Sequence, residues 1–433
     1  MPLNCPNIAI KNEIILNQEI CFFFPYFEES GVPVLFYRMA NVIASGYPSC
    51  NVSIIDFENG AMWKNVDSLV NIRKIQFLEG VSVSPPDNSV LVLQAILPYY
   101  WPSELVLKPN QRLFFWNLHP HNLVPSLLPM PFLRDLAFNN FIVYKLVAKL
   151  YPNLINRLQS YTSTLLNKRA LFFMDKPNLE LTEKYLFLKI QNRDFMQVPA
   201  EASKIGSFPK ITIELGRKIR IGWIGRLCDF KSYILVYTVK KINEIALDFR
   251  DKNIEFHIVG DGPFQSYIKE NLKKFDNISI VYHGSIPHKD IDKFISDEID
   301  IVMAMGTSAL EGAKLGKPTF ILDPILEEVK NDYFFRMIYD TQEFDLGHFI
   351  EESDYVKANT SLKDSLEDIF NNYSINANKS YLYFNENHNL ENVKDIFFKK
   401  ISESQLLYSM LSPNYFKKPL FLKLYNKIRG LKA

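Results

Sequence analysis

The chain has few cysteines and almost no net charge, and both scarcities exclude classes of protein. Its 433 residues include 4 cysteines, none of which stands in a CxxC pair or in a cluster with zinc spacing. A disulfide scaffold is therefore excluded, and we expect a reducing compartment. With 49 basic and 48 acidic residues, the formal charge is +1. A chain with so small a net charge has no overall positive potential that would attract nucleic acid, so we expect no nucleic-acid partner.

The sequence also lacks a long uninterrupted apolar run and a targeting segment. Residues 113–133 form the longest stretch without a charged side chain, but four prolines interrupt it. A membrane span would not be broken so often. Residues 1–13 show no basic region followed by an apolar run, which argues against a signal peptide. We therefore expect a cytoplasmic protein, either soluble or peripheral on the inner face of the plasma membrane.

Apolar runs alternate with helical patterns through the first half of the chain. A run at 20–24, a helical pattern at 32–45 and a second run at 52–57 form a strand–helix–strand unit. Such a unit predicts a parallel sheet that helices cover on both faces. Further strands are expected at 90–97, 112–118 and 171–174, and a helical region at 131–170 that Pro152 divides.

The second half repeats this alternation with greater regularity, which predicts a doubly wound sheet. We expect a linker near 199–216 and domains at 1–205 and 206–385. A helical segment and basic tail at 386–433 would pack back on the first domain. Ligands of such sheets bind beyond the carboxyl ends of the strands, so we expect the site in a cleft between the domains. The expected strands are 219–224, 254–259, 278–282, 299–304 and 319–322, and the expected helices 231–247, 264–275, 291–296 and 308–315.

Residues that suit a diphosphate follow the first strand of this second series. Two glycines of the segment 222–231 free the backbone, and Arg226 and Lys231 follow them. An arginine supplies a planar fork for phosphate oxygens, and a lysine supplies a mobile point charge. Two solvated surface cations remain the alternative. The later segments 260–263 and 283–288 also end strands, where ordinary turns would account for them.

A further candidate site lies at 303–313, where a strand ends, a glycine turns and a helix begins. Free backbone N–H groups and the helix dipole make such a helix start an anion site. Glu311 stands one turn inside the helix, where its carboxylate suits ribose hydroxyls. The pair Ser308 and Glu311 also has the spacing of a capping box, which would engage both side chains locally.

The order and spacing of these segments, from Ile219 to Asp323, resemble the donor domain of GT-B glycosyltransferases, above all glycosyltransferase family four. This resemblance implies two Rossmann-like domains facing a central cleft and a UDP- or GDP-sugar as donor. Arg226 and Lys231 match the residues that contact the donor pyrophosphate, and Glu311 matches the glutamate that binds ribose. Because these cations suit the diphosphate, we expect no metal and no other cofactor. The remaining donor-binding residues that the resemblance implies are Gly262, Ile286, Gly306, Thr307 and Ser308.

The first half matches the same family less closely. The segment 23–31 is similar to the glycine loop after the first strand, and Gly31 is its donor-binding residue. The segment 116–121 ends another strand and holds two histidines. His119 matches better than His121 the family histidine that touches the donor sugar, so His119 is the catalytic candidate.

One departure from the family pattern concerns the stereochemistry. Met303 stands where family four has the first glutamate of its E-x7-E pattern. The family retains anomeric configuration, but the short loop 306–308 is similar to that of an inverting enzyme, the peptidoglycan UDP-N-acetylglucosamine transferase. We therefore expect a hexosyltransferase of surface polysaccharide synthesis, acting on a glycan or lipid-linked acceptor, with inversion left open. A GT-B sugar-nucleotide epimerase and a non-catalytic nucleotide-sugar-binding subunit remain alternatives.

Two regions are locally basic despite the neutral total. Residues 131–170 contain six basic residues and one acid, and residues 412–433 contain six basic residues and no acid. Leucines and aromatic residues are interleaved with these charges, which suits an anionic membrane surface. A solvated helix face and a frayed tail are the alternative interpretation.

Overall fold

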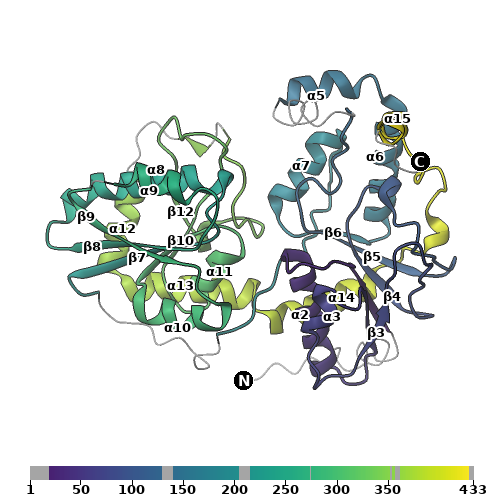
Figure 1. Cartoon of the computed structure of the whole chain (residues 1–433), viewed down its shortest axis with the longest axis horizontal. Helices are drawn as coiled ribbons and strands as arrows, with labels where there is room; N and C mark the ends of the chain where they lie inside the picture. Colours follow the sequence, from purple (N-terminus) through teal and green to yellow (C-terminus); the bar gives the residue numbers. More distant parts are fainter. Residues whose placement is uncertain are drawn as a thin grey trace. The chain divides into compact units, whose positions relative to one another are not determined.

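The structure is a computed structural model that describes residues 19–128, 140–203, 215–273, 275–351, 354–355 and 361–428. The chain divides into two compact units (Figure 1). Unit 1 comprises Met1–Val198 and Val393–Ala433, and unit 2 comprises Pro199–Asn392. The sequence places the corresponding boundaries after residues 205 and 385.

Unit 1 is built on a six-stranded parallel sheet with the order β3-β2-β1-β4-β5-β6. Most of its strands are short apolar runs whose residues are buried on both faces of the sheet, as the sequence pattern predicts. The strands are β1 (Ile20–Phe23), β2 (Val52–Asp56), β3 (Ile72–Gln76), β4 (Val90–Gln94), β5 (Arg112–Asn117) and β6 (Leu171–Phe173).

Helices cover both faces of this sheet. On one face, the Phe22 ring of β1 lies 5.4 Å from Phe36 of α2 and 5.9 Å from Phe397 of α14. On the other face, Tyr161 of α6 and Leu179 of α7 share a core cluster with β4 and β5. The helices are α2 (Gly31–Gly46), α3 (Ala61–Asn65), α5 (Phe141–Ala148), α6 (Pro152–Asn167), α7 (Lys176–Leu186), α14 (Leu390–Glu403) and α15 (Leu420–Ile428).

Pro152 is the first residue of α6, where the sequence predicts a division of the helical region. Residues 131–139 of that region lie outside the described residues. The chain beyond α14 stays with unit 1, because Arg112 of β5 donates from Nη2 to the carbonyl oxygens of Ile401 (2.8 Å) and Ser404 (2.7 Å).

Unit 2 contains a second six-stranded sheet, with the order β12-β11-β10-β7-β8-β9. Its pairs are parallel except for the antiparallel pair of β11 and β12. The strands are β7 (Lys218–Ile224), β8 (Asn253–Val259), β9 (Ile278–Gly284), β10 (Ile301–Ala304), β11 (Thr319–Ile321) and β12 (Arg336–Met337).

Two layers of helices enclose this sheet in Figure 1. Helices α8, α9 and α12 contribute to one core cluster, α10 and α11 contribute to the other, and α13 contributes to both. The helices are α8 (Asp229–Ile245), α9 (Gln265–Asn271), α10 (His288–Glu298), α11 (Thr307–Ala313), α12 (Ser361–Asn371) and α13 (Tyr373–Asn387).

The two sheets have the same strand order, 3-2-1-4-5-6 as in the Rossmann fold when the strands are counted within each unit, and differ in the direction of the last strand. The expected fold class, two doubly wound Rossmann-like α/β domains, is therefore confirmed. The strand order reverses between β1 and β4 in unit 1 and between β7 and β10 in unit 2. Ligands of this fold bind outside the carboxyl ends of the strands at such a reversal. The cleft expected between the domains stays a prediction.

Candidate functional site

The reversal point of unit 2 brings together the main residues predicted from the sequence. Strands β7 and β10 are hydrogen-bonded neighbours, with Gly222 opposite Val302 and Trp223 opposite Met303. Arg226 follows β7, and Gly306 follows β10. The two loops therefore leave the sheet side by side at its carboxyl edge. Met303 itself is buried inside β10, as expected from its apolar surroundings in the sequence.

Arg226 and Lys231 form a cation pair without a carboxylate partner among the residues that the structure describes. Arg226 is exposed, and Lys231 is half-buried in the first turn of α8. Desolvation lowers the pKa of Lys231, and the nearby charge of Arg226 lowers it further. The Lys231 ammonium lies 5.7 Å from the ring centre of Phe230. An anion placed between the two cations would relieve their repulsion.

The turn that contains Gly262 packs tightly against the Arg226 loop. Leu227 N donates to Asp261 O (3.0 Å), and Phe264 N donates to Leu227 O (3.1 Å). A Cβ atom on Gly262 would lie 2.2 Å from Leu227 O, so no larger residue fits without a backbone shift. The structure thus shows Gly262 supporting the loop of Arg226. Its predicted contact with a donor stays a prediction.

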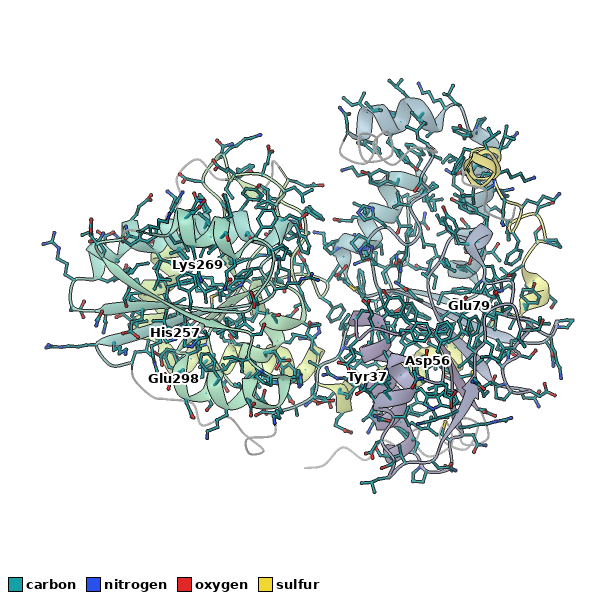
Figure 2. All side chains as sticks on the ribbon, viewed as in Figure 1. Tyr37, Asp56, Glu79, His257, Lys269 and Glu298 are labelled. Carbon is teal, nitrogen blue, oxygen red and sulfur yellow. The ribbon has the colours of Figure 1, made fainter. Side chains whose placement is uncertain are left out.

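Ile286 follows β9, and a pair of histidines lies on the neighbouring strands, His283 in β9 and His257 in β8. Ile286 is half-buried against the core cluster of α10 and α11. His283 Nε2 lies 3.0 Å from His257 Nδ1, and the two rings are stacked with centroids 5.0 Å apart. His257 Nε2 lies 3.4 Å from Glu255 Oε2. Figure 2 labels His257 in the interior of unit 2. The sequence did not single out Glu255 and His257, because two residues two positions apart lie on the same face of any strand and so carry no specific signal.

The start of α11 is not the capping box that the sequence left open. Gly306 is the N-cap, with φ of 60°, and no side chain caps the helix. Thr307 is exposed and Ser308 half-buried in the first turn. The capping-box alternative for Ser308 and Glu311 is therefore wrong, because it requires Ser308 as the N-cap and the observed N-cap, Gly306, lies two residues earlier. Because the N-cap is a glycine, no N-cap side chain accepts from the first N–H groups of α11, and Ala309 N donates to Gly306 O at 3.1 Å.

Glu311 instead belongs to a buried ion-pair triad that sequence reasoning missed. Its Oε2 lies 2.5 Å from Lys314 Nζ, which also lies 2.8 Å from Asp292 Oδ1 of α10. The Lys314 side chain is 3% exposed. Burial alone would lower the pKa of Lys314, but the carboxylates of Glu311 and Asp292 outweigh it and raise that pKa. The triad fixes the Glu311 carboxylate on the first turns of α11.

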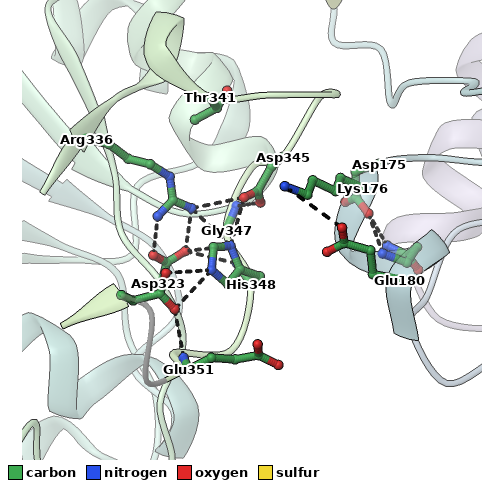
Figure 3. Close-up of polar contacts among 12 residues, drawn as sticks. Asp175, Lys176, Glu180, Asp323, Arg336, Thr341, Asp345, Gly347, His348 and Glu351 are labelled. Carbon is green, nitrogen blue, oxygen red and sulfur yellow. Dashed lines mark hydrogen bonds and ion pairs between the residues drawn. The ribbon is translucent and has the colours of Figure 1, made fainter. Parts of the chain in front are cut away.

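A second charged network supports the loop of Gly306 from the neighbouring strand (Figure 3). Asp323, fully buried just after β11, accepts hydrogen bonds from Arg336 Nη2 (2.7 Å) and Tyr333 Oη (2.7 Å). Arg336 Nη2 also donates to Asp345 Oδ2 at 3.1 Å. Gly306 N in turn donates to Leu346 O at 2.7 Å, next to Asp345 in the chain. The network therefore fixes the segment against which the Gly306 loop is held.

His348 completes this network and gives it a pH dependence. Burial alone would lower its pKa, but hydrogen bonds to Asp345 and Asp354 and the charge of Asp323 raise that pKa to about 10. A raised pKa in the folded state adds stability that is fully present below the ordinary value of 6.5 and is lost as the pH rises through about 10.

Replacement of His348 by Gln is expected to lower the melting temperature in a pH-dependent way. The difference from the wild type should be largest near pH 6.5 or below and should shrink toward pH 10. In this range the unfolded wild type has lost the proton of His348 and the folded wild type is losing it, whereas a glutamine at 348 does not titrate. Thermal melting of both proteins across this range measures the difference. A difference that stays constant with pH would contradict the charged state of His348.

In unit 1, the loop after β1 is organised by a residue that the sequence did not single out. Asp56, buried at the end of β2 and labelled in Figure 2, accepts backbone N–H bonds from Tyr26 (2.9 Å) and Met62 (2.9 Å). Gly31 is the exposed first residue of α2, and a Cβ atom there would meet no atom within 4 Å. The described residues of unit 1 therefore do not require a glycine at 31, and its donor contact stays a prediction.

His119 lies in an exposed turn after β5, next to the reversal point of unit 1. Its Nδ1 accepts the backbone N–H of His121 at 3.2 Å, so the neutral ring carries its proton on Nε2. Desolvation lowers the pKa of both histidines, and His119 lowers that of His121 further. His119 is thus an uncharged proton donor through Nε2. Its catalytic role stays a prediction.

Two negative observations hold for the described part of the chain. No group of three or more His, Cys, Asp or Glu side chains there is arranged to hold a metal ion. No helix within those ranges has the length and apolar character needed to cross a bilayer.

Comparison with known proteins gives structural likenesses alone. No family model matches the chain, and no curated protein matches its sequence. The solved structures that resemble it include Anabaena HepE in complex with UDP and glucose, which has 9% identity and a TM-score of 0.45 and covers 89% of this chain and 99% of that one. The lipopolysaccharide outer core galactosyltransferase WaaB has 11% identity and a TM-score of 0.45, over 90% of this chain and 100% of its own.

A glycosyltransferase from Rickettsia africae has 11% identity and a TM-score of 0.44, over 95% of this chain and 99% of its own. WaaB and the Rickettsia protein are glycosyltransferases by name, and the HepE structure contains UDP and glucose. With TM-scores below 0.5, the likenesses do not by themselves assign a function to this chain.

Proposed function

We propose that the chain is a glycosyltransferase that takes its sugar from a nucleoside-diphosphate sugar. The observation that supports this most is the cation pair of Arg226 and Lys231, which follows β7 at the reversal point of unit 2, where the neighbouring strand β10 leads into α11. Two cations that have no carboxylate partner among the described residues suit an anion that carries more than one charge.

The same groups would assist the chemical step. Negative charge grows on the departing diphosphate as the glycosidic bond breaks, and positioned cations stabilise that charge more than they stabilise the bound donor. Arg226 offers a rigid fork, and half-buried Lys231 offers a point charge whose attraction to an anion is less screened by water than at an exposed site. We propose that this pair makes a metal ion unnecessary. The backbone N–H groups of Thr307 and Ser308 would contribute further donors.

Glu311 would hold the ribose of the donor. Lys314 contacts its Oε2, which leaves Oε1 as the acceptor for a ribose hydroxyl. Lys314 and Asp292 then act as positioning residues, because they fix the carboxylate without touching the ligand. Gly31 and His119 of unit 1 complete the proposal, with His119 at the donor sugar.

Replacement of Glu311 by Gln is expected to weaken nucleotide binding about tenfold, since a hydrogen bond to a charged group contributes about 1.5–3 kcal/mol. The matched control is Asp292→Asn, which removes the other carboxylate of Lys314 and leaves Glu311 in place. Titration calorimetry with a nucleoside diphosphate compares the two. Equal losses in both variants would mean that Glu311 serves the triad alone.

The finer parts of the proposal concern the acceptor and the place of action. We propose a hexosyl transfer to a glycan or lipid-linked acceptor in surface polysaccharide synthesis, in the cytoplasm or at the inner face of the membrane. Retention follows from the family resemblance, and Met303 leaves inversion as the alternative.

A screen with UDP-, GDP-, ADP- and CMP-sugars tests the proposal, because a ligand of the native state raises the melting temperature. The stabilising donor is then incubated with the protein alone and with a panel of glycan and lipid-linked acceptors. Sugar transfer supports the proposal. Conversion of the donor alone would identify an epimerase, and binding without turnover would identify a nucleotide-sugar-binding subunit.

A further inference from the structure

The outward faces of α5 and α15 in unit 1 expose large apolar side chains. The exposed fractions are 71% for Ile142 and 58% for Leu146 on α5, and 70% for Leu420 and 50% for Leu424 on α15. Single exposed apolar residues are ordinary on a protein surface, but four large ones on two helices need an explanation.

The two helices present the same pattern outward. An apolar residue, a lysine and an apolar residue follow at spacings of three and one, as Ile142-Lys145-Leu146 on α5 and Leu420-Lys423-Leu424 on α15. Residues so spaced lie on one side of a helix. We name these six residues the lysine–leucine face.

The inward faces of the same helices hold them together. Tyr144 and Ala148 of α5 and Phe421 and Leu422 of α15 belong to one buried cluster. The Phe421 ring contacts Tyr151, with centroids 5.8 Å apart. Both helices lie at the same end of unit 1 in Figure 1. Helices α5 and α15, which belong to the two basic regions of the sequence, thus share one core cluster, and each helix has both exposed and buried apolar residues.

The surroundings of this face are positively charged. The sequence contains no Asp or Glu in residues 140–174 or 404–433. Lys145 and Lys423 form no ion pair with a described residue. The carboxylates of the neighbouring helix α7 are engaged, since Glu180 pairs with Arg193 at 3.1 Å and Glu183 accepts Ile190 N at 2.5 Å. No carboxylate of the described residues therefore neutralises the lysines of this face.

We propose that the lysine–leucine face binds the surface of an anionic lipid bilayer. Leucines flanked by lysines can enter the headgroup region while the ammonium groups meet lipid phosphates. A second copy of the chain is a poorer partner for this face, because symmetric pairing would oppose lysines to lysines. This inference is independent of the nucleotide site in unit 2.

Sedimentation of the full chain with lipid vesicles tests the inference. Vesicles of phosphatidylcholine with about a third phosphatidylglycerol should bind the protein, and vesicles of phosphatidylcholine alone should bind it far less. Each lysine at the surface contributes about fivefold, so the double variant Lys145→Gln/Lys423→Gln should bind on the order of twenty-fold more weakly. The variant Leu420→Gln/Leu424→Gln should lose about tenfold or more.

Matched controls use exposed residues elsewhere. Leu69→Gln removes a leucine that is 90% exposed in unit 1, and Lys240→Gln removes an exposed lysine of α8. Both should bind vesicles as the wild type does, and all variants should keep the wild-type melting temperature. Equal loss in the controls, or binding unchanged in both face variants, would overturn the inference. A different result would also overturn the inference: the wild type does not bind vesicles but forms a dimer in analytical ultracentrifugation, and the face variants do not form that dimer.

Discussion

Replacement of Arg226 or Lys231 by alanine is expected to lower kcat/KM for the donor by roughly tenfold to a hundredfold. Each side chain would form charge-assisted hydrogen bonds to the diphosphate, and such bonds contribute about 1.5–3 kcal/mol. Because the charge on the diphosphate grows as the bond breaks, kcat should fall along with donor affinity. Steady-state kinetics with the donor found by the screen measures both quantities.

The melting temperature should hardly change in these two variants. Arg226 is exposed and has no described ion-pair partner, so its loss removes little stability. Lys231 is desolvated and lies near a like charge, so its removal relieves a repulsion. Lys240→Ala, an exposed lysine later on the same helix α8, is the matched control and should keep full activity. Wild-type kcat/KM in both variants would refute the donor-site assignment.

Replacement of Asp323 by alanine is expected to reduce the free energy of unfolding of unit 2 by about 3–5 kcal/mol. The substitution leaves the guanidinium of Arg336, whose side chain is 12% exposed, without its main partner. It also removes the acceptor of the buried Tyr333 hydroxyl. Native-state hydrogen exchange of peptides from β10 and β11 in increasing urea measures the loss within unit 2.

A surface carboxylate in the same unit provides the control for Asp323. Glu327 pairs with Lys330 at 2.9 Å, and their side chains are 63% and 66% exposed. Removal of such a pair costs at most about 1 kcal/mol. A loss for Asp323→Ala as small as that for Glu327→Ala would contradict the structural role of the network. The Gly306 loop, held through Leu346, should show faster exchange in Asp323→Ala alone.

The strands of both sheets are largely readable from the sequence because burial on both faces requires continuous apolar runs. Strand β7 and strand β8 appear as such runs within one residue of their bounds. Strand β3, with the sequence IRKIQ, is half-buried at the sheet edge and was missed. Strand β12 pairs antiparallel with β11 and has only two residues, which is too few for a hydrophobic periodicity that would predict a strand.

The candidate site was predicted in part, and what was missed has a common cause. Arg226, Lys231 and Gly306 follow strand ends, and strand ends are visible in a sequence. The network of Asp323, Arg336 and His348 joins residues from different loops, and no spacing rule links them. The capping-box alternative rested on the spacing of Ser308 and Glu311 alone, and that spacing does not reveal that Gly306 is the N-cap. From the sequence, a lysine such as Lys314 is expected at the surface, and only the packing of the folded chain shows that its side chain is buried.

Calorimetric titration of the wild type and of Arg226→Ala/Lys231→Ala with nucleoside di- and monophosphates of one base tests the central claim most directly. The claim is that this cation pair binds the diphosphate of the donor. The wild type should bind the diphosphate at least tenfold more tightly than the monophosphate, equally well in EDTA, because the second phosphate meets both cations. The double variant should bind the two alike. A preference for the diphosphate that survives in the double variant would contradict the claim.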